Sequence, residues 1–388
     1  MTGSLRVLHA YNLHRGGGGA DNATLATIAA LRKQGIEIAT FVRDSRDIQN
    51  TLGGKLHAFI EGLYARQAVE DFAAVLDTFR PNLVHVHELY PLISPWILPE
   101  CSRRSIPVVM SVYDYRLTCP VHNHHFRGQT CTRCLNGHEF RCVWQNCRCS
   151  RAESLAFALR NAVARWFGLF AHHVALYITP TWFTADWLIQ HAGVAAEKVT
   201  VIPCLIDMPD TTVDPAEGRY VAFAGRFVPE KGVEVALAAA RRAGLPLWLA
   251  GDADHYPGVT AQDDVRFVLT HNREELAAFY RGARMFVMPS IWFETFGIVV
   301  GESMSHGVPV LASHIGALAE TTIDGVTGML FEPGNVEDLA KKMRLLWDDP
   351  ELCRRLGRGA RAHIVRTSNH DTHSRLTLAA YKDAIARA

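Results

Sequence analysis

Three features are scarce in this 388-residue chain: long apolar runs, an excess of one charge, and an apolar segment at its start. No apolar run reaches the roughly 18 residues of a membrane-spanning helix, so we expect no spanning segment. Residues 1–8 lack the apolar core of about 7 to 15 residues of a signal peptide, which predicts a cytoplasmic protein. The formal net charge of +1 is no basic excess, and we therefore expect no nucleic-acid partner.

The length of the chain, and the alternation of short apolar strands with helical stretches, predict two α/β domains with parallel sheets. A polar, proline-containing stretch at residues 207–218 predicts the linker. Strands are expected in the first half at 5–9, 36–42, 83–87, 107–112, 176–179 and 199–203. In the second half they are expected at 220–224, 246–250, 265–269, 285–288, 308–312 and 329–331. A helix from about Asp21 to Lys33 follows the first strand, and three helices should end the chain.

The most informative segment of the chain carries Glu294 and Glu302, eight positions apart. An apolar strand precedes the segment, a loop carries the first glutamate, and Gly297 then begins a helix that carries the second. The backbone amides of Phe296, Gly297 and Ile298 should lack intrahelical partners at that helix start, an arrangement that suits an anion. Two nearby carboxylates can accept hydrogen bonds from hydroxyls. Phosphate and hydroxyls on one ligand indicate a nucleotide sugar.

This segment resembles the Glu-x7-Glu signature of the retaining glycosyltransferases of the GT-B fold, in the large family 4 group. The resemblance continues, closely in the second half and loosely in the first, through residues 306–310, 317–320 and 324–328. It implies an α/β protein of two facing Rossmann-like domains with a cleft between them. The implied parts are an acceptor-side domain at 1–206, a cysteine-rich insertion within it at 117–150, a nucleotide-sugar domain at 207–369, and a last helix at about 370–388 that packs back on the first domain.

The resemblance also implies roles for individual residues. Glu302 would hold the donor ribose, and Glu294 would hold the sugar together with the amides of the helix start. Arg226 and Lys231 would stabilise the departing diphosphate, so the chemistry would need no divalent metal; without the resemblance they could be ordinary surface cations. We interpret the run Asp252-Ala253-Asp254 as a turn and not as a metal–diphosphate site. The donor-binding residues implied are Gly17, Gly18, Gly19, Thr295, Phe296, Gly297, Ile298 and Glu302.

Two further segments of the first half are candidates for ligand contact. The glycines at 16–19 let the backbone approach a ligand, and the family's glycine loop approaches the donor phosphates and the acceptor. Tyr113 stands where relatives commonly carry a histidine that faces the transferred sugar, and a phenol there can still donate a hydrogen bond. The neighbouring Asp114 would orient the acceptor or make a purely structural hydrogen bond. His85 and His87, at a strand end, would reach the ligand or lie satisfied in the core.

Cysteines cluster between residues 119 and 149. In a reducing compartment such clusters indicate metal binding more than disulfides. Cys131, Cys134, Cys142 and Cys147 have the paired spacing of a four-thiolate tetrahedral site, and we predict a structural zinc ion there. An iron–sulfur cluster and free thiols are the open alternatives. Relatives with a similar loop build surface polysaccharides, so the resemblance implies a glycan or lipid-linked glycan as acceptor.

Residues 154–170 have an amphipathic helical pattern. The expected apolar stripe comprises Leu155, Leu159, Ala162, Val163, Trp166 and Phe170, with arginines elsewhere. Such a helix ordinarily packs against its own domain. A peripheral contact with an anionic membrane, at the cytoplasmic face of the inner membrane, is the alternative; it would use Arg103, Arg104, Arg160, Arg165, Trp166 and Phe167.

Two other functions stay open at this stage. A nucleotide-sugar 2-epimerase has the same two-domain fold, and analysis of the products formed without any acceptor separates it from a transferase. A non-catalytic metal-binding interaction protein would use the cysteine loop as its module, but the intact set of Glu294, Arg226, Lys231 and Glu302 argues against it.

Overall fold

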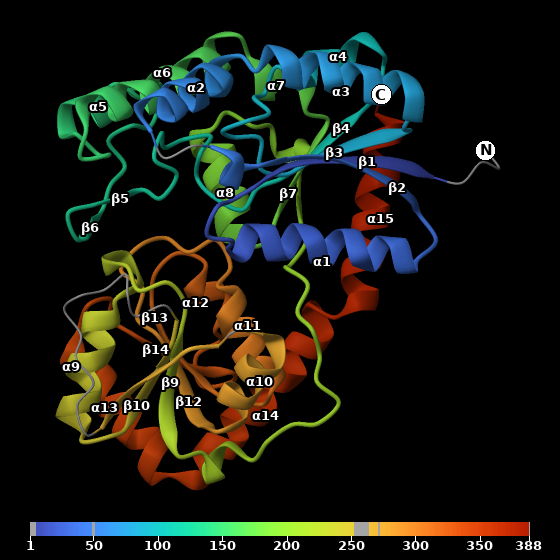
Figure 1. Cartoon of the computed structure of the whole chain (residues 1–388). Coiled ribbons are helices and arrows are strands. Elements are labelled where there is room, and N and C mark those ends of the chain that lie inside the picture. The colour runs from blue at the N-terminus through green and yellow to red at the C-terminus, as the bar shows by residue number, and fades with distance from the viewer. Residues whose placement is uncertain (1–4, 49–50, 252–263, 271, 388) are drawn as a thin grey trace. The chain divides into compact units, whose positions relative to one another are not determined.

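A computed structural model describes residues 5–48, 51–251, 264–270 and 272–387 of the chain. The contacts within it divide the chain into two compact units (Figure 1). Unit 1 comprises the described residues of 5–124, 131–205 and 373–387, and unit 2 those of 125–130 and 206–372. The run Asp252-Ala253-Asp254 lies outside the described residues.

Unit 1 contains a six-stranded parallel sheet with the order β2-β1-β3-β4-β7-β8. Its strands are β1 (Arg6–Leu13), β2 (Glu37–Asp44), β3 (Leu83–Val86), β4 (Val108–Ser111), β7 (Leu176–Thr179) and β8 (Val199–Val201). Its helices are α1 (Gly19–Lys33), α2 (Leu52–Leu63), α3 (Arg66–Phe79), α4 (Ile97–Arg103), α5 (Arg141–Gln145), α6 (Arg151–Trp166), α7 (Leu169–His173), α8 (Trp182–His191) and most of α15 (His370–Ala386). Because all strands are parallel, their carboxyl ends meet at one edge of the sheet.

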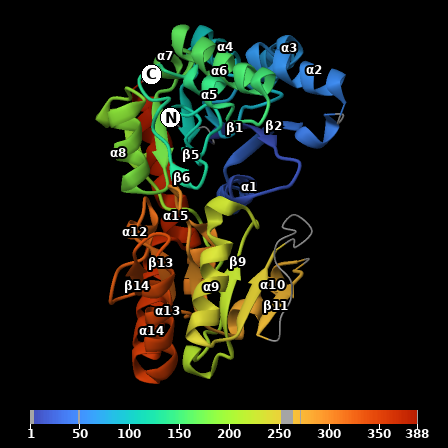
Figure 2. The same cartoon turned by 90° about the vertical axis from the view of Figure 1, so that its left-hand side faces the viewer.

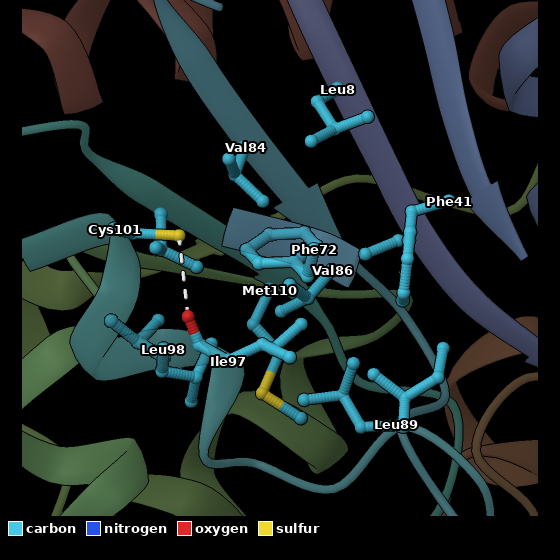
Figure 3. Close-up of a cluster of buried hydrophobic side chains, with 14 of the residues drawn as sticks. Leu8, Phe41, Phe72, Val84, Val86, Leu89, Ile97, Leu98, Cys101 and Met110 are labelled. Atoms are coloured by element: carbon cyan, nitrogen blue, oxygen red, sulfur yellow. Dashed lines mark hydrogen bonds between the residues drawn. The ribbon is translucent and has the colours of Figure 1, made fainter. Parts of the chain in front are cut away.

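Successive side chains along each strand of unit 1 point to opposite faces of the sheet, and both faces are buried. On one face Leu8, Val84 and Met110 pack against Phe72 of α3 and Leu98 of α4 (Figure 3). Helices α3, α4, α6 and α7 lie together at the top of Figure 2, on the side of the strands opposite α1. The other face is covered by α1 and α15, whose contributions to that core are Leu31, Ala380, Tyr381 and Ala384.

Unit 2 contains a second six-stranded parallel sheet, with the order β11-β10-β9-β12-β13-β14. Its strands are β9 (Tyr220–Ala224), β10 (Leu247–Ala250), β11 (Val265–Val268), β12 (Ala283–Met288), β13 (Val310–Ser313) and β14 (Gly328–Phe331). Its helices are α9 (Val233–Ala243), α10 (Arg273–Arg281), α11 (Ile298–Ser305), α12 (Leu318–Thr321), α13 (Val336–Asp348) and α14 (Pro350–Thr367). Helices α9 and α13 pack side by side on one face, where Leu237 and Met343 join the core. A short hairpin, β5 (His125–Phe126) with β6 (Gln129–Thr130), is grouped with this unit.

The predicted α/β class with two parallel sheets is confirmed, and each expected strand is present with its ends shifted by a few residues. The single helix expected over 154–170 is wrong. Gly168 takes a left-handed conformation with φ of +60° and separates α6 from α7, because a glycine accepts this conformation without steric cost. In the described part of the chain no helix has the length and apolarity needed to cross a bilayer.

The expected orientation of the 154–170 segment is also partly wrong. Leu155 and Trp166 are exposed, although both were expected on the buried stripe. Arg160, expected on the polar side, is buried with its guanidinium 4.0 Å above the ring of Tyr90, and it donates a hydrogen bond to the Pro120 carbonyl. Cation–π contact and a carbonyl acceptor together compensate for the burial of this charge.

Candidate functional site

Each sheet has one place where the strand order reverses. In unit 2 the chain runs outward from β9 to β10 and β11, then returns to place β12 on the other side of β9. In unit 1 the equivalent reversal lies between β1 and β3. Open α/β sheets bind ligands at such a switch point, beyond the carboxyl ends of the strands. The predicted site residues of both halves follow these four strands or their neighbour β4.

In unit 2 the switch point brings together two predicted site residues, Lys231 and Glu294. The Lys231 ammonium donates to Glu294 Oε1 at 2.6 Å, and the Ser290 hydroxyl and Trp292 indole donate to the same oxygen at 2.7 and 2.8 Å. The ammonium also lies 5.3 Å from the centre of the Trp292 ring. Glu294 is 5% exposed, so this buried carboxylate is held in one orientation by charge-assisted hydrogen bonds.

The local backbone explains why these two side chains meet. Gly232 ends the short turn that carries Lys231, with φ of +71°, and a Cβ there would lie 1.9 Å from the Pro289 carbonyl oxygen. Glycine therefore permits the loop after β9 to touch the loop after β12. A backbone hydrogen bond of 2.9 Å from Ile291 to the Glu230 carbonyl joins the same two loops.

Helix α11 begins directly after this carboxylate. Gly297 is its N-terminal cap residue, and Phe296 before it is buried. In the part of the chain that the structure describes, the amides of Phe296, Gly297 and Ile298 donate no hydrogen bond, as predicted for a helix start. Thr295 between Glu294 and Phe296 is half-buried. The site therefore offers a cation, a fixed carboxylate and a group of amide donors.

Glu302 and Arg226 are placed differently from Lys231. Glu302 is half-buried on α11, and its Oε2 accepts a 2.9 Å hydrogen bond from the Tyr280 hydroxyl. Burial raises the pKa of Glu302, partly offset by this hydrogen bond. Arg226 is exposed, and its side chain has no hydrogen bond or ion pair within the described ranges. Sequence reasoning missed Tyr280, which stands on α10 without a motif of its own.

In unit 1 the glycine loop follows β1 as predicted, and Gly17, Gly18 and Gly19 are exposed. Gly18 caps α1, which begins at Gly19 and not near Asp21. Asp21 instead turns back to accept hydrogen bonds of 3.0 Å from the His14 amide and the His14 ring. The hydrogen bond to Asp21 raises the pKa of His14, although partial burial of the ring opposes the shift.

Asp114 lies beyond the end of β4 in a buried charge cluster that includes two residues sequence reasoning missed. Arg116 contacts Asp114 Oδ2 at 2.7 Å and Glu88 Oε2 at 2.8 Å. Burial raises the pKa of Glu88 to about 7, against the opposing effect of Arg116. Burial also opposes ionisation of Asp114, but Arg116 and His122 hold its pKa below the usual value. The sequence feature that could have identified Glu88 is its position, one residue after His87 at a strand end.

Tyr113 is half-buried, and its ring stacks on that of His87 with centroids 6.1 Å apart. Burial raises the pKa of Tyr113, and the nearby Ser111 and Thr27 side chains oppose this shift. His85 and His87 are fully buried beside His9. Among the described residues, these three histidines are the only group of three or more His, Cys, Asp or Glu residues whose ligand atoms all lie within 4.8 Å of one another.

The four predicted zinc ligands do not form such a set. Cys134 and Cys142 are buried, and Cys131 and Cys147 are half-buried. A hydrogen bond from the Cys142 thiol lowers the pKa of Cys147 to about 7. Burial, followed by the charges of Cys119, Cys147 and Cys131, raises the pKa of Cys134 to about 12. The thiols thus gather in one region, and Cys119 is among them.

Comparison with protein families matches both halves of the chain. The family described as Glycosyltransferase Family 4 matches residues 17–208, and that described as Glycosyl transferases group 1 matches residues 209–363. The D-inositol 3-phosphate glycosyltransferase of Streptomyces bingchenggensis is 31% identical over 217 residues, which is 47% of this chain and 47% of that protein. The chain spans about half the length of the curated relatives it matches.

Two solved structures show the same fold over nearly the whole chain. Sucrose-phosphate synthase from Thermosynechococcus elongatus has a TM-score of 0.73 and 19% identity, and the match covers 99% of this chain and 100% of the synthase. Anabaena HepE in complex with UDP and glucose has a TM-score of 0.66 and 18% identity, with 97% and 98% covered. Together with the two family matches, this places the chain in the family 4 group of glycosyltransferases with the GT-B fold.

Proposed function

We propose that this chain is a retaining glycosyltransferase that moves a sugar from a nucleoside diphosphate sugar to a hydroxyl acceptor. The observation that carries the proposal is the meeting of Lys231, Glu294 and the amide donors at residues 296–298 at one switch point. A cation and amides suit a diphosphate, and a fixed carboxylate suits sugar hydroxyls. Unit 2 would thus bind the donor, and unit 1 the acceptor.

Each group of unit 2 has a distinct task in this proposal. Lys231 and the exposed Arg226 would stabilise the charge that grows on the diphosphate as the sugar bond breaks. Glu294 would hold the sugar hydroxyls, and Glu302 the ribose hydroxyls. Acceptor attack on the face that the leaving group departs from, with the phosphate taking the acceptor proton, would retain configuration without a divalent metal. Retention rests on the family resemblance.

A thermal-shift panel of UDP, GDP and ADP, and of their sugars, tests donor binding. A nucleotide at 100 times its dissociation constant should raise the free energy of unfolding by about 2.7 kcal/mol. Product analysis with and without added glycans then separates a transferase from an epimerase, which would convert the donor alone. Absence of stabilisation by every nucleotide would overturn the proposal.

We also propose that the cysteine loop holds a structural zinc ion through Cys131, Cys134, Cys142 and Cys147. Zinc–sulfur bonds of about 2.3 Å require the thiols to approach one another more closely than they do here. Gathered thiols, and a low pKa at Cys147, support the site. Elemental analysis of protein purified without added metal should give about one zinc per chain, and a ratio near zero would contradict the proposal.

The acceptor would be a glycan or lipid-linked glycan of surface polysaccharide biosynthesis, reached by peripheral contact with an anionic membrane. Trp166 and Phe167 support this contact because each is 59% exposed, and Trp144 on α5 is 88% exposed. The predicted charges contribute less than expected. Arg160 is buried, and Arg103, Arg104 and Arg165 are paired with Glu100, Asp77 and Glu139.

A further inference from the structure

Three side chains of unit 2 donate to the same oxygen of the Glu294 carboxylate. The Lys231 ammonium lies 2.6 Å from Oε1, the Ser290 hydroxyl 2.7 Å and the Trp292 indole nitrogen 2.8 Å. A carboxylate oxygen has two lone pairs, so three donors fill its capacity to accept hydrogen bonds. A ligand hydroxyl that bonds to Glu294 must therefore use the other oxygen, Oε2.

The three donors differ in what else they can bind. The Lys231 ammonium has three N–H groups, so it can bond to Glu294 and to a second acceptor together. The Ser290 hydroxyl and the Trp292 indole have one proton each, and both protons point to Glu294. Both of these side chains are neutral and buried. Their hydrogen bonds are thus committed to the carboxylate, whereas the ammonium can be shared.

The loop after β12 brings the two neutral donors to the carboxylate by its own sequence. Ser290, Trp292 and Glu294 occupy alternate positions of this loop, and their polar atoms converge on one point. A backbone hydrogen bond of 2.9 Å from Ile291 to the Glu230 carbonyl anchors the same loop. Because both neutral donors belong to the loop that carries Glu294, their bonds to it do not depend on the position of the ammonium.

Trp292 contacts both members of the charge pair. Its indole N–H donates to Glu294, and the Lys231 ammonium lies 5.3 Å from the centre of its ring. A cation within about 6 Å of an aromatic face is attracted to the ring. Trp292 therefore stabilises the position of the ammonium as well as that of the carboxylate.

The proposed function requires Lys231 and Glu294 to act on different parts of the donor substrate. A diphosphate carries more negative charge than one carboxylate, so it attracts the ammonium more strongly. When Lys231 turns to the diphosphate, Glu294 loses a charge-assisted hydrogen bond. Loss of a partner is costly for a buried carboxylate unless other donors remain on it. Ser290 and Trp292 are two donors that remain.

We infer that Ser290 and Trp292 are positioning residues of the donor site: they hold Glu294 in place while Lys231 turns to the diphosphate, and so direct Oε2 at the hydroxyls of the transferred sugar. This inference rests on the proposed function and adds two residues that act through Glu294. Removal of either donor should therefore weaken recognition of the sugar and spare recognition of the nucleotide.

The first test compares each nucleotide with its own sugar. Calorimetric titration is done with UDP and UDP-glucose, GDP and GDP-mannose, and ADP and ADP-glucose, and the pair that binds the native chain is used. Ser290→Ala and Trp292→Phe should each weaken binding of the nucleotide sugar about tenfold, the effect of losing one hydrogen bond to a charged group. Binding of the nucleotide alone should stay unchanged.

The matched control for Trp292→Phe is Trp248→Phe, which removes the same indole N–H from a half-buried ring on β10 that stacks on Tyr220. This control should leave the affinities for the nucleotide and for its sugar in their native ratio. Equal weakening of both ligands in Ser290→Ala and Trp292→Phe would show a merely structural role and overturn the inference. Unchanged binding of both ligands would overturn it as well.

The second test follows the indole proton of Trp292 and needs no sugar. Nitrogen-15 NMR of tryptophan-labelled protein reports this N–H, with Trp292→Phe assigning the signal. The proton should exchange slowly with water in the native chain, with and without saturating nucleotide, because its bond to Glu294 persists. It should stay equally protected in Lys231→Ala, where the ammonium is removed altogether.

Faster exchange of this proton in Lys231→Ala, or on saturation with nucleotide, would show that Trp292 does not hold Glu294 by itself and would overturn the inference. The two proposals can fail separately. Absence of binding by every nucleotide to the native chain would sink the proposed function. Normal nucleotide binding with an unchanged preference for the sugar in both variants would sink only the role of Ser290 and Trp292.

Discussion

The two switch points occupy the same place in two similar sheets, yet they are built in different ways. In unit 2 the groups that meet come from two short loops, and one ammonium–carboxylate contact orders them. In unit 1 the equivalent place rests on neutral histidines and hydroxyls drawn from β1, β3, β4, α1 and α15. One site depends on a charge pair formed by local motifs, and the other on hydrogen bonds between distant segments of the unit.

The largest expected effect of this difference is on acid stability. Burial lowers the pKa of His9 to about 3 and those of His85 and His87 well below the usual value. Below about pH 6.5 the unfolded chain binds protons that the folded unit does not, so stability is present above that pH and is lost as the pH falls. Each such histidine should lower the free energy of unfolding by about 2 kcal/mol when the pH falls from 7 to 5.

Unit 2 should lose less, because within the described ranges His306 is its one histidine whose pKa burial lowers to about 4, although burial also lowers the pKa values of His363 and His125 there. Hydrogen exchange of peptides from β3 and β12 in urea, at pH 7 and pH 5, measures the two units separately after correction for intrinsic rates. His306→Phe keeps a ring against Tyr280 and should reduce the acid-induced loss of stability of unit 2. Equal acid losses in the two units would show that the comparison is wrong.

The second largest effect should come from the charge pair of unit 2. Lys231→Ala removes the cation beside Glu294 and should lower turnover on the true substrates by about 10²–10³, the usual cost of losing one group that stabilises transition-state charge. Steady-state kinetics are the measurement. Arg241→Ala, at an exposed position on α9, is the control and should leave turnover unchanged. Near-normal turnover in Lys231→Ala would sink the assignment of this site.

A smaller effect should follow from Glu302→Gln. Loss of the charged acceptor should weaken UDP binding by about tenfold or more, at nearly unchanged turnover under saturation, since a charged hydrogen bond contributes about 1.5–3 kcal/mol. Calorimetric titration with UDP measures it. Tyr280→Phe removes the hydroxyl that occupies Glu302 Oε2 but keeps the carboxylate, so it should bind at least as tightly as the native chain. A turnover defect without weaker binding would refute the ribose role.

The same contrast explains what could be predicted from the amino-acid sequence. The strands, and the meeting of Lys231 with Glu294, follow from local patterns, because parallel strands bring their carboxyl ends to one edge. The hydrogen bond between His85 and Tyr381 could not be predicted, since it depends on which face of β3 meets α15. The prediction that Arg160 lies on the polar side of its helix was wrong for a similar reason, because only the fold reveals Tyr90 as its partner.

The smallest effect concerns the membrane, and it tests whether the exposed surface of unit 1 adds a third kind of interaction. With Arg160 buried and Arg165 paired, aromatic side chains should contribute more than charge. Flotation with anionic liposomes should therefore show weak binding that changes little between low and high salt. Each unpaired basic residue would instead add about 1 kcal/mol of salt-sensitive attraction.

Trp144→Ala together with Trp166→Ala should abolish flotation, because both rings are exposed and neither is needed for the core of unit 1. Leu345→Ala, an exposed apolar position on α13 of unit 2, is the matched control and should leave flotation unchanged. If the native chain stays at the bottom of the gradient at low salt, the aromatic surface does not bind lipid, and the acceptor is then reached in solution. A strong salt dependence would mean that the paired arginines exchange their carboxylate partners for lipid phosphates.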